Sequence, residues 1–198
     1  MIVWINGAFG SGKTQTAHEL QRRVPGSYLY DPENVGYFLR KNMPRSLQTD
    51  DFQDDPLWRE FNYKMLSSIA VRHSGAVIVP MTIVNRTYFE EIVGRLRTDG
   101  ETVRHFALCA SRETLLKRLR SRGEGGRSWA ARQIDRCAEG LAHEAFRCHL
   151  DTEGRTIEQV AERIAAMAGL ELAPDTRHGW KKRLDRLGTQ IRHIRFFQ

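Results

Sequence analysis

The stretch GAFGSGKT, residues 7–14, decides the fold of this 198-residue chain. It follows the apolar run IVWIN at residues 2–6 and precedes the amphipathic segment TQTAHELQRRV at residues 14–24. A glycine-rich turn between a strand and a helix is typical of a loop that surrounds phosphate groups with backbone N–H groups. We therefore expect a nucleoside triphosphate to be bound by the residues of this loop, namely Gly7, Ala8, Phe9, Gly10, Ser11, Gly12, Lys13 and Thr14.

Two side chains at the end of the loop carry the expected chemistry. Lys13 would place a positive charge beside the β- and γ-phosphate oxygens of ATP, and the Thr14 hydroxyl would be a ligand of Mg²⁺. A tight strand-to-helix turn with an exposed lysine is the alternative. The full GxxxxGK[ST] spacing favours ATP and Mg²⁺ as cofactors.

Hydrophobic periodicity beyond the loop predicts alternating strands and helices. This pattern indicates an α/β fold with a doubly wound parallel sheet of about five strands, as in P-loop kinases. The predicted strands are residues 2–6, 27–31, 75–84, 102–110 and 148–151. The predicted helices are residues 14–24, 33–43, 56–73, 86–100, 112–122, 129–147 and 156–169, the last opened by a capping box of Thr156 and Gln159.

The end of the third predicted strand helps to separate kinases from motor ATPases. Switches and motors normally carry an aspartate there to hold Mg²⁺. Here the strand AVIVPMT ends in Pro80, Met81 and Thr82. The sequence therefore favours a kinase over a motor.

An acidic residue does follow the second predicted strand, in YLYDPEN at residues 28–34. The carboxyl ends of parallel strands line the ligand crevice of a doubly wound sheet. Asp31 could therefore accept a proton from an attacking hydroxyl or hold a water molecule of the magnesium ion. Alternatively, Asp31 only starts a turn and caps the next helix, and Glu33 is an ordinary acid of a first helical turn.

Arginines surround the glycine-rich break GEGG at residues 123–126. A lid over about residues 122–136 could close on the ATP and neutralise the charge of a transferring phosphoryl group. A solvated basic helix is the alternative. We expect catalytic arginines of the lid at Arg118, Arg122 and Arg132, beside Arg112, Arg120, Arg127 and Arg136.

Composition limits the class of protein. The three cysteines include no CxxC pair, which argues against a disulfide framework and for a cytoplasmic protein. A zinc site of Cys137, His143, Cys148 and His149 is conceivable, but ordinary buried thiols fit better. The sequence shows neither a signal-peptide pattern nor an apolar run long enough to span a bilayer.

Several segments together resemble one family. They are WINGAFGSGKTQTA, YDPENVG, DDFQDDPLWREFNY, VIVPMTIV, ETLLKRLRSR, SWAARQIDRCAEGL and APDTRHGW. In these segments the chain is similar, almost end to end, to the tunicamycin resistance protein family of bacterial ATP-binding proteins. The resemblance implies a P-loop fold related to nucleoside and nucleotide kinases, and resistance to a uridine-containing, lipid-tailed antibiotic. It also implies membrane association through the C-terminal segment.

Aromatic residues gather between the second and third strands, where by resemblance such kinases keep the acceptor pocket. Aromatic faces suit a uracil ring, and Gln53 could pair with its amide edge. Core packing is the alternative for any one of them. The predicted substrate-binding residues are Asp31, Phe38, Phe52, Gln53, Trp58 and Phe61, with Tyr37 and Tyr63 nearby.

The last 25 residues carry most of the net charge of +7, since seven Lys or Arg and two Asp in residues 174–198 give +5. Helical spacing aligns Trp180, Leu184, Leu187, Ile191 and Ile194 in one stripe. Such a helix suits an anionic membrane surface, with Trp180 and Phe196 or Phe197 as anchors. Docking on the body or on a dimer partner is the alternative; a nucleic-acid arm is the weakest, and we expect no nucleic-acid partner.

These observations predict a P-loop domain over residues 1–172 and a basic amphipathic helix over residues 173–198. The preferred function is an ATP-dependent phosphotransferase acting on tunicamycin or a similar nucleoside antibiotic, in the cytoplasm and at the membrane periphery. An ATP-dependent protein that binds and sequesters the drug without turnover also fits. A nucleotide kinase is a third possibility, and a homodimer is compatible with each.

Overall fold

A computed structural model describes residues 1–126 and 128–193; Arg127 and residues 194–198, which include Ile194, Arg195, Phe196 and Phe197, lie outside the described residues. So do the side chains of six residues of the C-terminal helix, namely Arg183, Arg186, Gln190, Ile191, Arg192 and His193. The core is one five-stranded parallel sheet of order β2-β3-β1-β4-β5, which confirms the predicted fold class. The strands are β1 (Ile2–Gly7), β2 (Tyr28–Leu29), β3 (Val77–Pro80), β4 (Val103–Cys109) and β5 (His149–Asp151).

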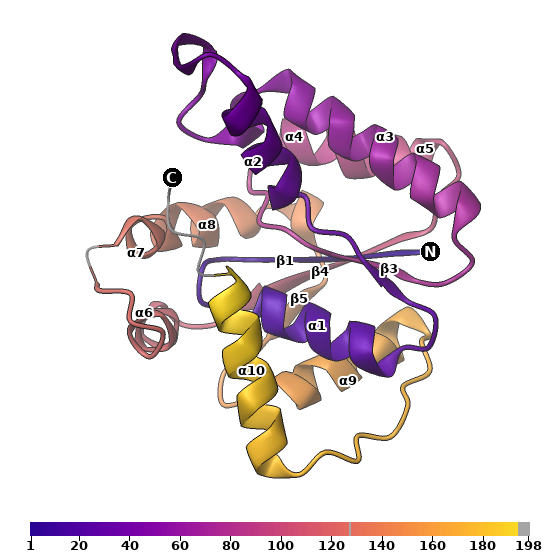
Figure 1. Cartoon of the computed structure of the whole chain (residues 1–198), viewed down its shortest axis with the longest axis vertical. Helices are drawn as coiled ribbons and strands as arrows, with labels where there is room; N and C mark the ends of the chain where they lie inside the picture. The colour runs from indigo at the N-terminus through magenta and orange to yellow at the C-terminus, as the bar shows by residue number, and fades with distance from the viewer. Residues whose placement is uncertain (127, 194–198) are drawn as a thin grey trace.

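Helices cover both faces of the sheet (Figure 1). One layer holds α1 (Lys13–Arg23), α9 (Ile157–Ala168) and α10 (Gly179–His193). The other holds α2 (Glu33–Asn42), α3 (Pro56–Arg72), α4 (Arg86–Phe89), a π-helical turn Glu90–Gly94, α5 (Arg95–Thr98) and α8 (Ile134–Leu141). Two further helices, α6 (Arg112–Arg120) and α7 (Trp129–Arg132), lie beside the end of β1 that leads into α1.

Central strand β1 is buried on both faces. Val3 and Ile5 belong to the core under α1 and α9, while Ile2 and Trp4 belong to the core under α2 and α3. This division follows from the alternation of side chains along a strand. The neighbours of β1 are in register at its first residue, where Ile2 pairs with Val77 and with Val103. The pairing with β4 continues to Gly7, while β3 ends at Pro80 opposite Ile5.

Several predicted elements differ from the structure. The helix predicted over residues 173–198 begins only at Gly179. The second strand is only two residues long, although the Tyr30 N–H still donates to the Ile78 carbonyl at 2.9 Å. The predicted strand 75–84 is ordered as a strand only over Val77–Pro80. The predicted helix 129–147 is wrong: it is divided into α7, α8 and a 3-10 turn Glu144–Phe146, because the chain turns to bury Phe146 in the core. The capping box of Thr156 and Gln159 is confirmed.

Buried Asn6 joins the end of β1 to the chain that follows β3. Its Nδ2 donates to the Ile83 carbonyl at 2.8 Å, while its Oδ1 accepts from the N–H groups of Ile83 at 3.1 Å and Gly7 at 2.8 Å. We expect Asn6→Leu to lower the free energy of unfolding by about 2–4 kcal/mol, because three buried backbone groups lose their partner.

The matched control is Asn42→Leu, since Asn42 is exposed and its Nδ2 makes one hydrogen bond to the Phe38 carbonyl at 2.7 Å. It should change the free energy of unfolding by at most about 1 kcal/mol. Urea unfolding of both variants measures the difference, and equal losses would contradict the role given to Asn6.

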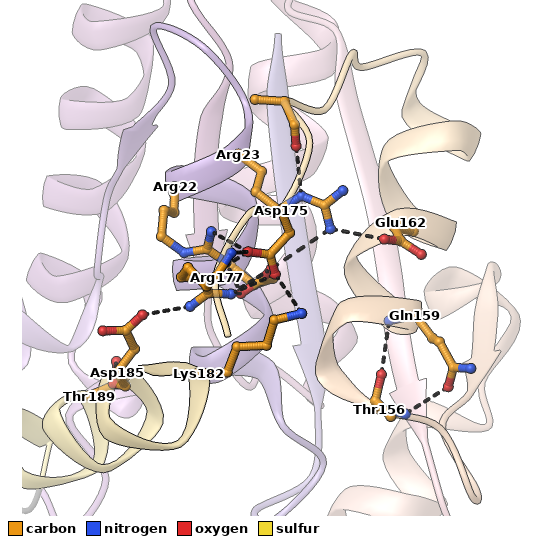
Figure 2. Close-up of polar contacts among 12 residues, drawn as sticks. Arg22, Arg23, Thr156, Gln159, Glu162, Asp175, Arg177, Lys182, Asp185 and Thr189 are labelled. Atoms are coloured by element: carbon orange, nitrogen blue, oxygen red, sulfur yellow. Dashed lines mark hydrogen bonds and ion pairs between the residues drawn. The ribbon is translucent and has the colours of Figure 1, made fainter. Parts of the chain in front are cut away.

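Charged side chains fasten the C-terminal segment to α1 and α9 (Figure 2). Arg177 lies at the centre: its guanidinium is 2.9 Å from Glu19, 2.9 Å from Asp175 and 2.6 Å from Asp185. Arg23 of α1 binds the start of the same segment, because its Nε donates to the Ala173 carbonyl at 3.0 Å. The carboxylates of Glu19, Glu158 and Asp175 lie close together. Arg177 pairs with both Glu19 and Asp175, Lys182 also pairs with Asp175, and Arg177 holds the pKa of Asp175 well below its usual range.

The C-terminal helix α10 exposes its described apolar side chains to solvent. Trp180, Leu184 and Leu187 are 66%, 57% and 51% exposed. The contacts with α1 therefore come from the polar side of the segment, while the predicted stripe faces away from the body, as far as its residues are described. Within the described part of the chain, no helix is long and apolar enough to cross a membrane.

Candidate nucleotide and acceptor site

The phosphate loop runs from the end of β1 into α1 in a conformation that requires glycine. Gly7, Gly10 and Gly12 have φ angles of 146°, 84° and 97°. A Cβ on Gly7 would lie 2.8 Å from the Leu108 carbonyl oxygen, and one on Gly10 would lie 2.8 Å from the Leu115 carbonyl oxygen. The loop is thus fitted between β4 and α6 at two points where no side chain is tolerated.

Polar groups around the loop are ready for an anion. The first N–H groups of α1 have no helical acceptor, and Gly12 caps the helix without a side-chain hydrogen bond. Among the described residues, the buried hydroxyls of Ser11 and Thr16 also lack a hydrogen-bond partner. A buried hydroxyl without a partner is unfavourable, so these groups fit the phosphate chain of ATP and its Mg²⁺, with Thr14 at the start of α1 beside them.

Lys13 lies folded back over the loop. Its Nζ donates to the Ala8 carbonyl at 3.2 Å and is 5.5 Å from the centre of the Phe9 ring. Burial lowers the pKa of Lys13 to about 8; Glu33 opposes this shift, and Arg122 adds to it. The structure therefore brings the loop lysine, an acid from α2 and an arginine from the lid into one electrostatic cluster.

The lowered pKa of Lys13 predicts that ATP affinity depends on pH. The ammonium form predominates below about pH 8 and is lost as the pH rises through that value. We expect ATP affinity to be constant below about pH 7 and to fall above about pH 8 by up to tenfold per pH unit. Near pH 8, binding should take up about half a proton, because the triphosphate raises the pKa of Lys13 again.

Calorimetry of ATP binding, in buffers of different ionisation enthalpy between pH 6.5 and 9.5, measures both quantities. The Lys13→Met variant is the control and should show neither the loss of affinity nor the proton uptake. A flat pH profile for the natural protein would contradict the assignment.

Thr82, two residues after the end of β3, stabilises the phosphate loop. The Thr82 hydroxyl donates to the Gly7 carbonyl at 2.8 Å and so fixes the first residue of the phosphate loop. No carboxylate stands here, since Pro80 ends β3 and Met81 and Thr82 follow it. The nearby acids follow β2 instead, at Asp31 and Glu33.

Asp31 lines a pocket of about 430 Å³ formed by β2, α1, α2 and α3. Its Oδ1 also accepts a hydrogen bond from the Glu33 N–H at 3.0 Å, so it caps α2 as well. Aromatic rings form much of the wall. The pocket residues beside Asp31 are Tyr28, Tyr30, Phe38, Phe61, Met65, Leu29, Val35, Asn34 and His18.

Of the predicted aromatic residues, Phe38 and Phe61 line this pocket, with ring centres 6.4 Å apart. Trp58 lies beneath it: the side chain is wholly buried, and its Nε1 donates to the Pro32 carbonyl at 3.1 Å. Phe52 packs on Trp58 at 5.5 Å between ring centres and fills the space beside Gly36. These two rings support the start of α2 and do not line the pocket.

Gln53 also lies outside the pocket lining. Its N–H donates to Asp51 Oδ1 at 3.1 Å, and its carbonyl accepts from Arg59 at 2.5 Å. These backbone contacts fix the 3-10 turn Phe52–Asp54. More distant still is Tyr63, whose hydroxyl donates to Asp99 at 2.6 Å on the outer side of α3.

The predicted lid packs against the phosphate loop. The Phe9 ring meets Trp129 of α7 edge to face, with 5.0 Å between ring centres. Ala8, Leu115, Leu119, Ile134 and Cys137 share one hydrophobic cluster beneath this contact. On the far side, Arg136 of α8 lies 3.4 Å from Asp51, which joins the lid to the turn before α3.

The lid arginines have different surroundings. Arg118 makes its hydrogen bonds within the protein. It donates to the Thr152 carbonyl at 2.7 Å and to the Thr152 hydroxyl at 3.0 Å, and it lies 3.5 Å from the Ser11 carbonyl. Arg122 follows the end of α6, and burial lowers its pKa. Arg132 is exposed on α7. Of these three arginines, Arg122 is the one whose charge contributes to the lowered pKa of Lys13, after burial.

Two residues of the site, Glu33 and Trp129, were not among the predicted site residues. Glu33 opposes the charge of Lys13, although its position in a first helical turn gave no reason to prefer it. Its spacing of two from Asp31 was the available signal, since both acids follow one strand end. The Phe9–Trp129 contact joins residues 120 positions apart in the chain, and only the fold could reveal it.

Comparisons with known proteins agree with the fold. A family model described as an AAA domain matches residues 2–146. The structure of the Deinococcus radiodurans tunicamycin resistance protein is similar at 36% identity and TM-score 0.74, covering 88% of this chain and 99% of that one. No curated protein matches the chain in sequence.

More distant structures share the fold. A sugar kinase from Janibacter sp. has 21% identity and TM-score 0.61, over 85% of this chain and 94% of its own. The Mycobacterium tuberculosis APS kinase in complex with AMPPNP and APS has 15% identity and TM-score 0.53, over 85% and 96%. The resemblance stated from the sequence is confirmed: the chain belongs to the tunicamycin resistance protein family, built on an AAA-type P-loop domain with the kinase-like fold.

Proposed function

We propose that this protein transfers the γ-phosphoryl group of ATP to a hydroxyl of a nucleoside-type antibiotic such as tunicamycin. The observation that carries the proposal is the position of Asp31, which lines an aromatic pocket at the same end of the sheet as the phosphate loop. Binding pockets of small molecules run from about 300 to 1,000 Å³, so 430 Å³ suits the nucleoside part of such a drug. Its lipid tail would remain outside.

In this mechanism, the rings of Phe38 and Phe61 hold the base, and Asp31 accepts the proton of the attacking hydroxyl. The hydroxyl oxygen forms the new bond to the γ-phosphorus, the bond from that phosphorus to the bridging oxygen breaks, and ADP leaves with the electron pair. Lys13 and Arg122 stabilise the negative charge on the transferred group. Thr14, with Asp31 or Glu33 through water, would hold Mg²⁺, which neutralises phosphate charge when bound.

The remaining predicted residues take supporting parts in the proposal. Phe52, Gln53 and Trp58 hold the start of α2 and the turn before α3, so they position the pocket wall. Arg118 keeps Thr152 and the phosphate loop together, and Arg132 would reach the nucleotide only if the lid moves. Residues 1–172 form the phosphotransfer unit, with the lid at about residues 122–136.

Mass spectrometry of tunicamycin incubated with the protein, ATP and Mg²⁺ tests the proposal. The expected product is heavier than the drug by one phosphoryl group, and its amount should exceed that of the protein. Tight stoichiometric binding of unmodified drug would instead support sequestration. A panel of nucleoside monophosphates, assayed in parallel, identifies a nucleotide kinase if one of them is phosphorylated faster than the drug.

We propose further that α10 holds the protein at an anionic membrane surface. The exposed stripe of Trp180, Leu184 and Leu187 supports this, since ion pairs on its other side already fix the helix to α1. Exposed Lys181 stands next to the stripe and would meet lipid phosphates. A second copy of the chain could also cover this stripe.

Leu184→Asp is expected to weaken binding to phosphatidylglycerol vesicles by tenfold or more, because a leucine contributes about 1.5–3 kcal/mol on burial. The control is Val71→Asp at the end of α3, since Val71 is 78% exposed and the charge change is the same. Vesicle co-sedimentation measures the affinity. Equal loss in both variants would contradict the role of α10, and a dimer disrupted by Leu184→Asp, without vesicle binding, would assign the stripe to a second copy.

A further inference from the structure

Two buried hydrogen bonds join α3 to the residues on either side of Asp31. On one side, the Tyr30 hydroxyl donates to Asn62 Oδ1 at 2.8 Å. On the other side, the indole Nε1 of Trp58 donates to the Pro32 carbonyl at 3.1 Å. Asn62 and Trp58 are one helical turn apart on α3. The chain before the acid and the chain after it are thus both fastened to the same turn of one helix.

Asn62 has both ends of its side-chain amide fixed. Its Oδ1 accepts from Tyr30, and its Nδ2 donates to the Trp58 carbonyl at 2.8 Å. The second bond orients the amide, because it leaves the oxygen and not the nitrogen to face Tyr30. Burial raises the pKa of Tyr30, so its hydroxyl keeps the proton that it donates.

Packing alone does not account for an amide at position 62. Asn62 is wholly buried and lies at four-residue spacing between Trp58 and Leu66, which both belong to the hydrophobic core. A leucine would bury apolar surface there without needing any partner, whereas a buried amide is unfavourable unless it is hydrogen-bonded. A buried network in which every polar group is satisfied instead holds its members in one arrangement.

The acid itself is fixed to the first turn of α2. Asp31 Oδ1 accepts from the Glu33 N–H at 3.0 Å, and the Asp31 carbonyl accepts from the Asn34 N–H at 3.2 Å. These bonds place the carboxylate relative to α2, while the bond from Trp58 places the start of α2 relative to α3. The direction of the Asp31 side chain at the pocket wall therefore depends on α3.

We propose that Asn62 and Trp58 are positioning residues that direct the Asp31 carboxylate toward the acceptor hydroxyl. This inference rests on the proposed phosphotransfer and names the groups on which its base depends. A general base must lie within hydrogen-bond reach of the proton that it removes, and a misplacement of about 1 Å can cost about 10²-fold in rate. Neither Asn62 nor Trp58 lines the pocket, so both act through Asp31.

Drug phosphorylation by the variants Asn62→Leu and Trp58→Phe tests this proposal. Asn62→Leu removes both hydrogen bonds of the amide at a similar side-chain size, and Trp58→Phe removes the indole N–H while an aromatic ring remains. Each variant is expected to lower kcat by about 10- to 100-fold and to leave the KM for ATP within about twofold. Product formation at saturating drug and ATP, followed by mass spectrometry, measures kcat.

An Asp31→Asn background separates positioning from damage to the fold. There, Trp58→Phe should change kcat by less than about twofold, because no base is left to misplace. A merely structural effect would lower kcat by the same factor in both backgrounds. The matched control is Trp4→Phe, since Trp4 is wholly buried in the same hydrophobic core and its Nε1 donates to the Met81 carbonyl at 3.3 Å. It should leave kcat unchanged.

Two results would overturn the positioning role and leave the proposed function standing. One is an inactive Asp31→Asn variant beside Asn62→Leu and Trp58→Phe variants of full kcat, and the other is an equal loss in the two backgrounds. A fully active Asp31→Asn variant, or a natural protein that does not phosphorylate the drug, would overturn the proposed mechanism and this inference together. Should Asn62→Leu fail to fold, Trp58→Phe and its control give the same decision.

Discussion

Lys13→Met is expected to reduce phosphotransfer by about 10²–10³-fold and to weaken ATP binding strongly. Lys13 is the cation that the phosphate loop itself provides, and it lies over the loop within 3.2 Å of the Ala8 carbonyl. Methionine keeps the apolar stem of the side chain, so the packing against Phe9 survives while the charge is lost. Steady-state kinetics and ATP calorimetry measure the two effects.

The same variant should be at least as stable as the natural protein without ATP. Burial lowers the pKa of Lys13, so the charged form is less favourable in the folded state than in the unfolded chain. That cost is present below about pH 8 and disappears as the pH rises to the ordinary value of 10.5. Removal of the charge should therefore leave the melting temperature at pH 7 unchanged or higher.

Lys117→Met is the matched control, because Lys117 is exposed on α6 and the net charge changes equally. It should leave both ATP affinity and stability unchanged. A lower melting temperature for Lys13→Met would mean that lost activity reflects damaged folding. Full activity in that variant would remove Lys13 from the mechanism.

Local patterns predicted the parts of the molecule that depend on neighbouring residues. The phosphate loop, the capping box of α9 and the order of strands and helices follow from glycine spacing, cap residues and hydrophobic periodicity. The helix predicted over residues 129–147 fails because burial of Phe146, 0% exposed, outweighs local helix propensity. That burial depends on rings of Phe89 and His105, which come from distant segments.

The aromatic residues around Asp31 show the same limit of prediction from local sequence. Residue type identified Phe38 and Phe61 as pocket aromatics, but it could not separate them from Trp58, which has the same chemistry and lies wholly in the core. Tyr28 of β2 and Tyr30, which follows the strand, complete the pocket, although alternating aromatics in such a segment indicate ordinary packing. Which side of an aromatic cluster is open depends on how α2 crosses α3, and no local pattern encodes that angle.

Asp31→Asn is expected to lower the rate of drug phosphorylation by about 10²–10⁴-fold and to leave ATP affinity unchanged. The substitution separates the two roles of this residue. Asparagine is as good a helix cap as aspartate, so the hydrogen bond from the Glu33 N–H at 3.0 Å persists and α2 keeps its start. Only the ability to take up a proton is lost.

Asp31→Ala removes both roles and should also lower the free energy of unfolding by about 0.5–2 kcal/mol. Glu33→Gln is the neighbouring control. It removes the acid that opposes the shift at Lys13, so the pKa of Lys13 should fall further and ATP affinity should decline at a lower pH than in the natural protein. Drug phosphorylation below pH 7 should be affected much less than in Asp31→Asn.

These three variants distinguish a general base from a cap. If Asp31 is the base, Asp31→Asn is stable and inactive. If it is only a cap, Asp31→Asn keeps its activity, and Asp31→Ala loses stability alone. If Glu33→Gln is instead the inactive and stable variant, the proton acceptor is the second acid after β2, and the pocket wall that carries Asp31 serves binding only. Product formation followed by mass spectrometry, beside urea unfolding of each variant, decides among the three.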